Sequence, residues 1–113
     1  MKKEKLFYIL TLLPFLGCND TNIGLEAPKC LEGRIETFNQ SSHCDDSSVQ
    51  EFMFQGKKVY VFDPGTCGND MQSAVYDANC NSLGALGGFA GETSINGVDF
   101  PSNSEYIRTV WEK

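Results

Sequence analysis

Five cysteines are the side chains of this 113-residue chain that could do the most varied chemistry. Thiolates act as nucleophiles and accept alkyl groups, and sets of cysteines form disulfides or bind zinc. Cys18 closes an apolar N-terminal segment, whereas the others lie between residues 30 and 80. The spacing therefore separates one terminal thiol from an even set of four: Cys30, Cys44, Cys67 and Cys80.

The N-terminal segment is typical of an export signal. It opens with basic residues, and an apolar run from Leu6 to Leu16 follows. This run is too short to span a bilayer, which needs about 20 apolar residues. It ends in Phe15-Leu16-Gly17-Cys18, which resembles the lipobox of bacterial lipoproteins, where the cysteine receives a diacylglycerol and the chain is cut before it.

The lipobox resemblance predicts how the chain is organised. Residues 1–17 would be a lipoprotein signal peptide, residues 18–29 the lipidated Cys18 with a polar tether, and residues 30–113 a single extracytoplasmic domain. Lipid on Cys18 would make the membrane a partner of the protein. The predicted location is the cell envelope, on the extracytoplasmic side and at the outer membrane. The alternatives are a plain secretory signal and a core helix that happens to end in a cysteine.

The chain is acidic, with a formal net charge of −6. Residues 1–17 hold three lysines and one glutamate, so the chain that starts at Cys18 carries −8. Nucleic-acid binding depends on Lys and Arg side chains that neutralise phosphates. We therefore expect no nucleic-acid partner.

The four later cysteines predict two disulfides, because an exported domain folds in an oxidising compartment. Three pairings are possible. Cys30–Cys44 with Cys67–Cys80 is the favoured one, since each bond closes a short local loop. A four-cysteine zinc site is the competing interpretation, and the lack of a Cys-x-x-Cys pair argues against it. We expect no metal and no cofactor.

Apolar periodicity predicts a helix followed by strands. Leu31, Ile35 and Phe38 recur at helical spacing, and this face would pack on a sheet. Glycines in residues 82–91 suit tight turns or close backbone approach. The predicted class is α+β, with one short N-terminal helix packed on a small disulfide-stapled antiparallel sheet of three to four strands. Those strands are a hairpin of residues 49–54 and 59–62, a strand at 74–77 and a last strand at 106–111.

The predicted hairpin carries four aromatic rings, Phe52, Phe54, Tyr60 and Phe62. One helix can cover only one face of a small sheet. Some of these rings could therefore form an exposed patch that binds a partner. The alternative is that loops and the last strand cover them.

Two further patterns in the sequence bear on metal binding and catalysis. Asp77-x-Asn79-x-Asn81 resembles the first half of a calcium loop, but Ser82 and Gly88 stand where that loop needs Gly and Glu, so an Asx-rich turn is favoured. The single histidine, His43, lies in a polar loop, and no nucleophile elbow is present. We predict no catalytic residues and no enzymatic activity.

Several short motifs follow one another in a distinctive order between residues 30 and 113: Cys30-Leu31, residues 54–57 and 59–64, Cys67, Tyr76-Asp-x-x-Cys-Asn, Gly87-Gly88 and Trp111. In this order of motifs the chain resembles small bacterial lipoproteins of the Bacteroidota type that belong to a domain-of-unknown-function family. The resemblance implies no particular activity.

The leading hypothesis is a lipid-anchored binding or interaction module of the cell envelope, with an envelope protein or ligand as its partner. A small protease-inhibitor-like domain, offering a rigid loop such as residues 84–91, is a second hypothesis. An enzyme or thiol-redox protein that uses Cys67 or Cys80 is a third.

Overall fold

The structure is a computed structural model that describes residues 27–113. The predicted signal peptide, the lipidation site Cys18 and most of the tether lie outside the described residues, so those expectations stay predictions. Within residues 27–113, no helix has both the length and the apolar character needed to cross a membrane. The elements, in chain order, are α1 (Lys29–Ser41), β1 (Ser48–Phe54), β2 (Lys57–Asp63), β3 (Gln72–Asp77), β4 (Ser82–Gly87), β5 (Ser94–Ile95), β6 (Val98–Asp99), α2 (Phe100–Asn103) and β7 (Ser104–Glu112).

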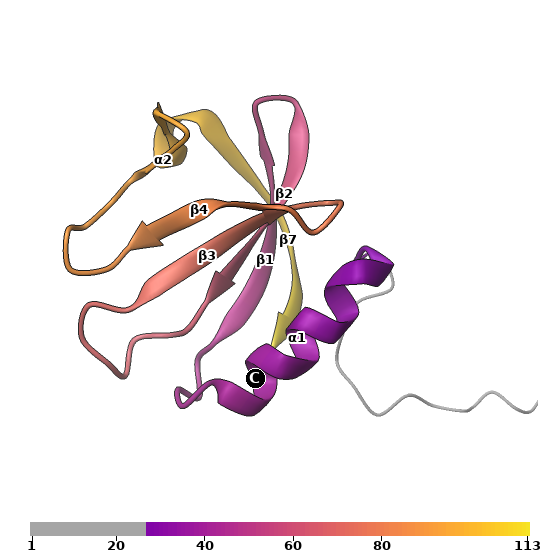
Figure 1. The fold of residues 1–113 in the computed structure, drawn as a ribbon, viewed down its shortest axis with the longest axis vertical. Coiled ribbons are helices and arrows are strands. Elements are labelled where there is room, and N and C mark those ends of the chain that lie inside the picture. The colour runs from indigo at the N-terminus through magenta and orange to yellow at the C-terminus, as the bar shows by residue number, and fades with distance from the viewer. Residues whose placement is uncertain (1–26) are drawn as a thin grey trace, which may run out of the picture.

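The fold is mostly β, which corrects the predicted α+β class. A five-stranded antiparallel sheet has the order β4-β3-β2-β1-β7 (Figure 1). Strands β5 and β6 form a second, two-stranded sheet. The predicted strand number was too low because the glycine-rich segment contributes β4. Ala85 of β4 pairs with Ala74 of β3, and Gly84 pairs with Val75 at a φ of 141° that other residues rarely adopt.

The hairpin of β1 and β2 confirms the strongest strand prediction. Its two-residue turn consists of Gln55 and Gly56, at φ 54° and 78°. Positive φ at both central residues is the geometry of a type I′ turn, whose twist matches that of antiparallel strands. The turn fixes the register, in which Glu51 lies opposite Tyr60.

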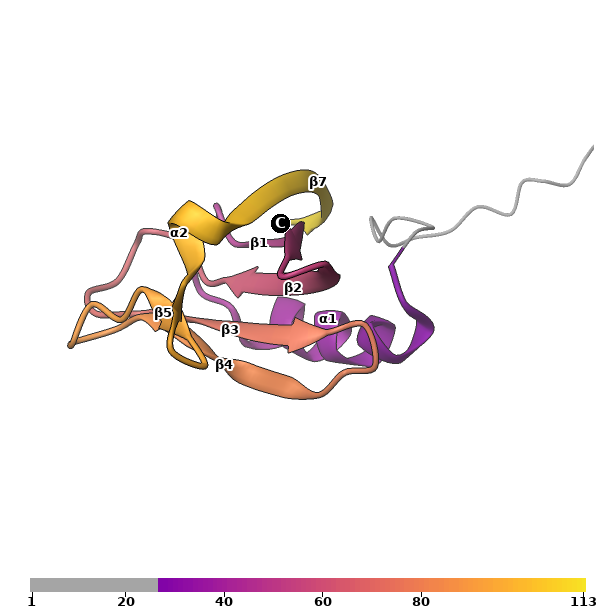
Figure 2. The same ribbon diagram turned by 90° about the horizontal axis from the view of Figure 1, so that it is seen from above.

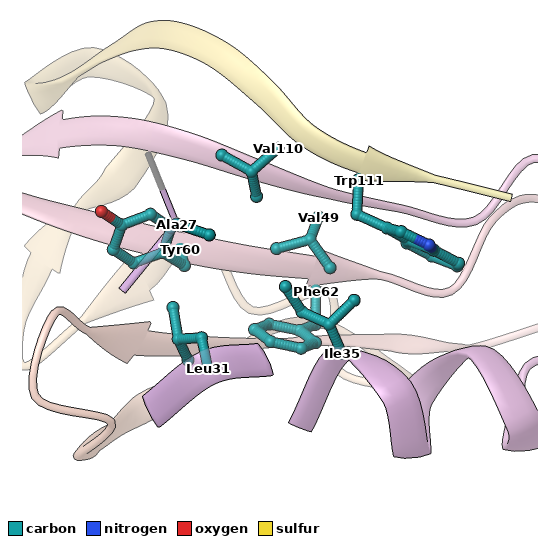
Figure 3. Packing of buried hydrophobic residues seen from close by; sticks show 8 residues of the cluster. All are labelled: Ala27, Leu31, Ile35, Val49, Tyr60, Phe62, Val110 and Trp111. Carbon is teal, nitrogen blue, oxygen red and sulfur yellow. The ribbon is translucent and has the colours of Figure 1, made fainter. Parts of the chain in front are cut away.

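Helix α1 covers one face of the five-stranded sheet (Figure 2). Leu31 and Ile35 are fully buried and point at the sheet (Figure 3), and the ring of Phe38 packs edge-on against Phe62 and Trp111. The predicted apolar helix face is thereby confirmed. At the other end of the chain, the Lys113 ammonium donates to two carbonyls at the C-terminal end of α1, where a cation is favourable.

The opposite face of the sheet is covered by the β5–β6 pair and α2. Ile95 and Phe100 are buried there against strands β1 to β3. The side chain of Asp99 caps α2 by accepting from the amide and hydroxyl of Ser102, and these bonds lower the pKa of Asp99. A second hydrophobic core therefore lies on the sheet face opposite α1, for which the sequence predicted no covering element.

Strand β7 confirms the predicted last strand, but its side chains do not alternate simply. The pairing with β1 shifts register twice, between Val49 and Gln50 and between Glu51 and Phe52. Such bulges rotate the bulged strand, and both Val110 and Trp111 are consequently buried in the core under α1.

The two disulfides are present, but their pairing is not the favoured one. Cys30 at the start of α1 binds Cys80 in the β3–β4 turn, and Cys44 after α1 binds Cys67 in the β2–β3 loop. The sequence separations are 50 and 23 residues, so neither bond closes the short loop that was predicted. Sheet topology decides the pairing, because it brings the two ends of β3 beside the two ends of α1.

Candidate functional site

The aromatic rings of the hairpin do not form an exposed patch. Phe54, Tyr60 and Phe62 are buried, and Phe52 is half-buried. Tyr60 and Phe62 face α1, whereas Phe52 and Phe54 pack on the other face against Phe100. The prediction of a partner patch at these residues is corrected, because both faces of the sheet are covered.

An open groove of about 420 Å³ lies instead between α1 and strand β3. A volume of this size is in the range of small-molecule sites. The helix contributes one wall, and the adjoining strands contribute the floor and the other wall. The residues that line the groove are Gly33, Arg34, Thr37, Phe38, Ser41, Phe62, Gln72, Ala74 and Tyr76.

Three rings and a small side chain give the groove its apolar surface. Phe62 packs edge-on against both Phe38 and Tyr76, with ring centroids 5.3 and 5.2 Å apart. Ala74 on β3 lies opposite Phe62 of β2, and its partner on β4 is the equally small Ala85.

Arg34 is the only charged residue that lines the groove. Its guanidinium carbon lies 4.5 Å from the centre of the Tyr76 ring, and Nη1 donates to the Tyr76 hydroxyl at 3.5 Å. Arginine presents five donors, so a guanidinium stacked in this way can still bind an anion. In a chain of net charge −6, the groove is thus a local cationic site.

The two disulfides fasten α1 at both ends of the groove. Cys30–Cys80 joins the start of α1 to the turn after β3, and Cys44–Cys67 joins the loop after α1 to the loop before β3. A hydrogen-bonded bridge reinforces the second link, since Asp46 accepts from the Thr66 hydroxyl at 2.6 Å and from its amide. These bonds lower the pKa of Asp46. The walls of the groove are therefore held before any ligand binds.

A buried ionic cluster on β7, β1 and β2 was missed by sequence reasoning. Glu51 is fully buried, its Oε1 accepts from Arg108, and its Oε2 accepts from the Tyr60 hydroxyl at 2.6 Å. Burial and the hydrogen bond to Glu51 raise the pKa of Tyr60. The only signal in the sequence is a glutamate inside an apolar strand, which identifies neither partner.

The segment with the calcium-like spacing forms an Asx turn. Asp77 Oδ1 accepts from the amides of Asn79 and Asn81, both at 2.9 Å, and these bonds lower the pKa of Asp77. The favoured interpretation of this segment is thus confirmed. Across residues 27–113, no group of three or more His, Cys, Asp and Glu side chains is placed to hold a metal ion.

The other residues singled out from the sequence lie apart from the groove. His43 is exposed in the loop after α1, and Cys67 and Cys80 are in disulfides. The proposed inhibitory loop is split, because residues 84–87 belong to β4. The rest of it is a closed turn, in which the Gly91 amide donates to the Gly88 carbonyl at 3.1 Å.

Fold and groove together define a small, disulfide-bonded, mostly β domain with an open groove beside helix α1. The chain belongs to the family described as Domain of unknown function (DUF6970), whose profile matches residues 36–113. This match confirms the domain-of-unknown-function part of the family resemblance. No curated protein and no solved structure matches the chain.

Proposed function

We propose that the protein is a lipid-anchored binding module of the cell envelope, and that the groove between α1 and β3 is its ligand site. The observation that carries the proposal is the composition of the groove, which combines three aromatic rings with a single cation. The ligand class that fits is an apolar or aromatic group that bears a carboxylate.

The lining residues favour binding over catalysis. Thr37, Ser41 and Gln72 offer hydrogen-bonding groups, but none of the residues that line the groove is an acid, a histidine or a cysteine. General acid–base and nucleophilic catalysis rely mostly on those side chains. The groove supplies stacking, hydrogen bonding and charge, which are sufficient for recognition.

The carboxylate preference follows from Arg34. Charge-assisted hydrogen bonds from arginine to a carboxylate are among the stronger ones in proteins, and the planar guanidinium can form two at once. Phe38 and Tyr76 lie beside it and can receive the apolar part of the ligand. An acidic protein repels free anions at long range, so the groove selects anions that also bury apolar surface.

Phenylacetate and phenylacetamide test this selectivity, because they share a ring and differ in charge. We expect phenylacetate to bind the 113-residue chain more tightly, and Arg34→Ala to weaken phenylacetate about tenfold while changing phenylacetamide little. Amide chemical-shift titrations measure both affinities. Lys29→Ala, which removes an exposed cation at the start of the same helix, is the matched control. Equal binding of phenylacetate by the two variants would refute the ligand class.

The anchor is tested separately at Cys18. We expect a fatty-acid analogue fed to the producing cells to label the wild-type chain and not Cys18→Ser, since only the thiol can accept the lipid. Cys18→Ser should also move the protein from the membrane fraction to the soluble fraction. Labelling of the serine variant at the wild-type level would contradict the anchor, whatever the outcome of the ligand titrations.

A further inference from the structure

The turn after β4 presents the most exposed large apolar side chain among residues 27–113. Phe89 is 91% exposed, whereas the next such residue, Tyr106, is 53% exposed. Large aromatic side chains that project fully into water cost solvation free energy, and at interfaces they fill pockets of the partner. Phe89 does not line the groove, so ligand binding in the groove does not account for its exposure.

Hydrogen bonds hold this turn in one conformation. Gly87 and Glu92 exchange two backbone bonds of 2.7 and 3.0 Å, and the Gly91 amide donates to the Gly88 carbonyl at 3.1 Å. The Gly88 amide also donates to the Met71 carbonyl at 3.1 Å, which fastens the turn to the start of β3. Phe89 therefore lies at the tip of a turn whose backbone is ordered before a partner binds, and this order lowers the entropy cost of docking.

The loops that lie at the same end of the sheet as this turn are acidic (Figures 1 and 2). The Cys44–Cys67 disulfide and the bond to Met71 connect it to the loops at residues 42–47 and 63–71. These two loops and residues 87–93 contain no Lys and no Arg. Their carboxylates are Asp45, Asp46, Asp63, Asp70 and Glu92.

The turn also lies away from the point where the chain enters the domain. Both ribbon views place the β2–β3 and β4–β5 loops at one end of the sheet, and the β3–β4 turn and the start of α1 at the other (Figures 1 and 2). The Phe89 end is therefore free to meet a partner when the start of α1 is held.

We propose that the Phe89 turn is a protein-docking site, and that its partner is a protein with an apolar pocket rimmed by Lys and Arg. The ring fills the pocket, and the basic rim faces the five carboxylates of the loops at this end of the sheet. Charge complementarity of this kind steers association and disfavours acidic partners. An anionic lipid surface does not fit, because it would face the same carboxylates. This surface is additional to the groove and does not involve Arg34.

The test places the photoreactive amino acid benzoylphenylalanine at position 89 of the full chain in the cells that produce it. The matched control carries it at position 106, in place of the other exposed aromatic residue. We expect a single protein adduct at position 89 that the control lacks. The captured protein is then identified and purified, and its affinity is measured for the wild-type chain and for Phe89→Ala at two salt concentrations.

We expect Phe89→Ala to weaken that complex at least about 30-fold, as for an interface hot spot, and added salt to weaken the wild-type complex. The variant should unfold like the wild type, because the ring is exposed. Five results would overturn the proposal: no adduct, the same adducts at both positions, an adduct to lipid, an adduct to a second copy of this acidic chain, or equal affinity of the captured protein for wild type and Phe89→Ala.

Discussion

Replacing Cys30 and Cys80 together by serine should lower the free energy of unfolding by about 4 kcal/mol, as expected for a bond across 50 residues. The bond closes a large loop in the unfolded chain, so its removal restores much conformational entropy to that state. The same variant should bind phenylacetate more weakly, because the start of α1 is no longer fastened to the end of β3. Urea denaturation measures the first effect and chemical-shift titration the second.

The second disulfide supplies the matched comparison. Replacing Cys44 and Cys67 by serine should cost slightly less, about 3.5 kcal/mol, because that bond spans 23 residues. Mapping of unreduced peptides should recover Cys30 linked to Cys80. Peptides that link Cys30 to Cys44 would contradict the disulfide pairing. A loss of unfolding free energy below about 1 kcal/mol in both variants would contradict the stabilising role of the disulfides.

Replacing Arg108 by alanine should lower the free energy of unfolding by about 3 kcal/mol. Removing one partner of a buried ion pair typically costs about 3–5 kcal/mol, because the remaining charge stays buried without compensation. Glu51 is fully buried, whereas the Arg108 side chain is 38% exposed, so water can partly reach the site and the lower end applies. Thermal and urea unfolding measure the loss.

Two variants calibrate this result. Tyr60→Phe removes only the hydroxyl that donates to Glu51 and should cost about 1 kcal/mol. Glu105→Ala, on the same strand but exposed, should leave the stability nearly unchanged. If Arg108→Ala were no more destabilising than Glu105→Ala, the cluster would not stabilise the sheet.

The features that the sequence predicted well are those with local causes. The β1–β2 hairpin follows from two aromatic, β-branched segments around Gln55-Gly56, and α1 follows from apolar spacing within one helix. Strand β4 was missed because glycine has no local preference for a strand. Only its pairing with β3 makes it one. The disulfide pairing was also missed because it has no local cause. It depends on the position of β3 beside α1, which only the folded sheet determines.

The groove was beyond sequence reasoning because its two walls are distant in the chain. Arg34 and Tyr76 are 42 residues apart, and nothing in either segment indicates that they meet. One signal was available, since Arg34 is the only Lys or Arg between residues 30 and 56 of an acidic chain. The exposed patch was predicted wrongly because the sequence did not show that β5, β6 and α2 cover the second face of the sheet.

The proposal that the α1–β3 groove binds ligand is tested most directly by locating bound phenylacetate in the 113-residue chain. Intermolecular nuclear Overhauser effects report which protein protons lie beside the ligand ring. We expect them to the methyl group of Ala74 and to the ring of Phe38, and we expect both to weaken in Arg34→Ala at the same phenylacetate concentration. Effects confined to the smaller pocket near Phe54, Leu83 and Ile95 would contradict the proposal, as would binding that leaves every residue of the groove unperturbed.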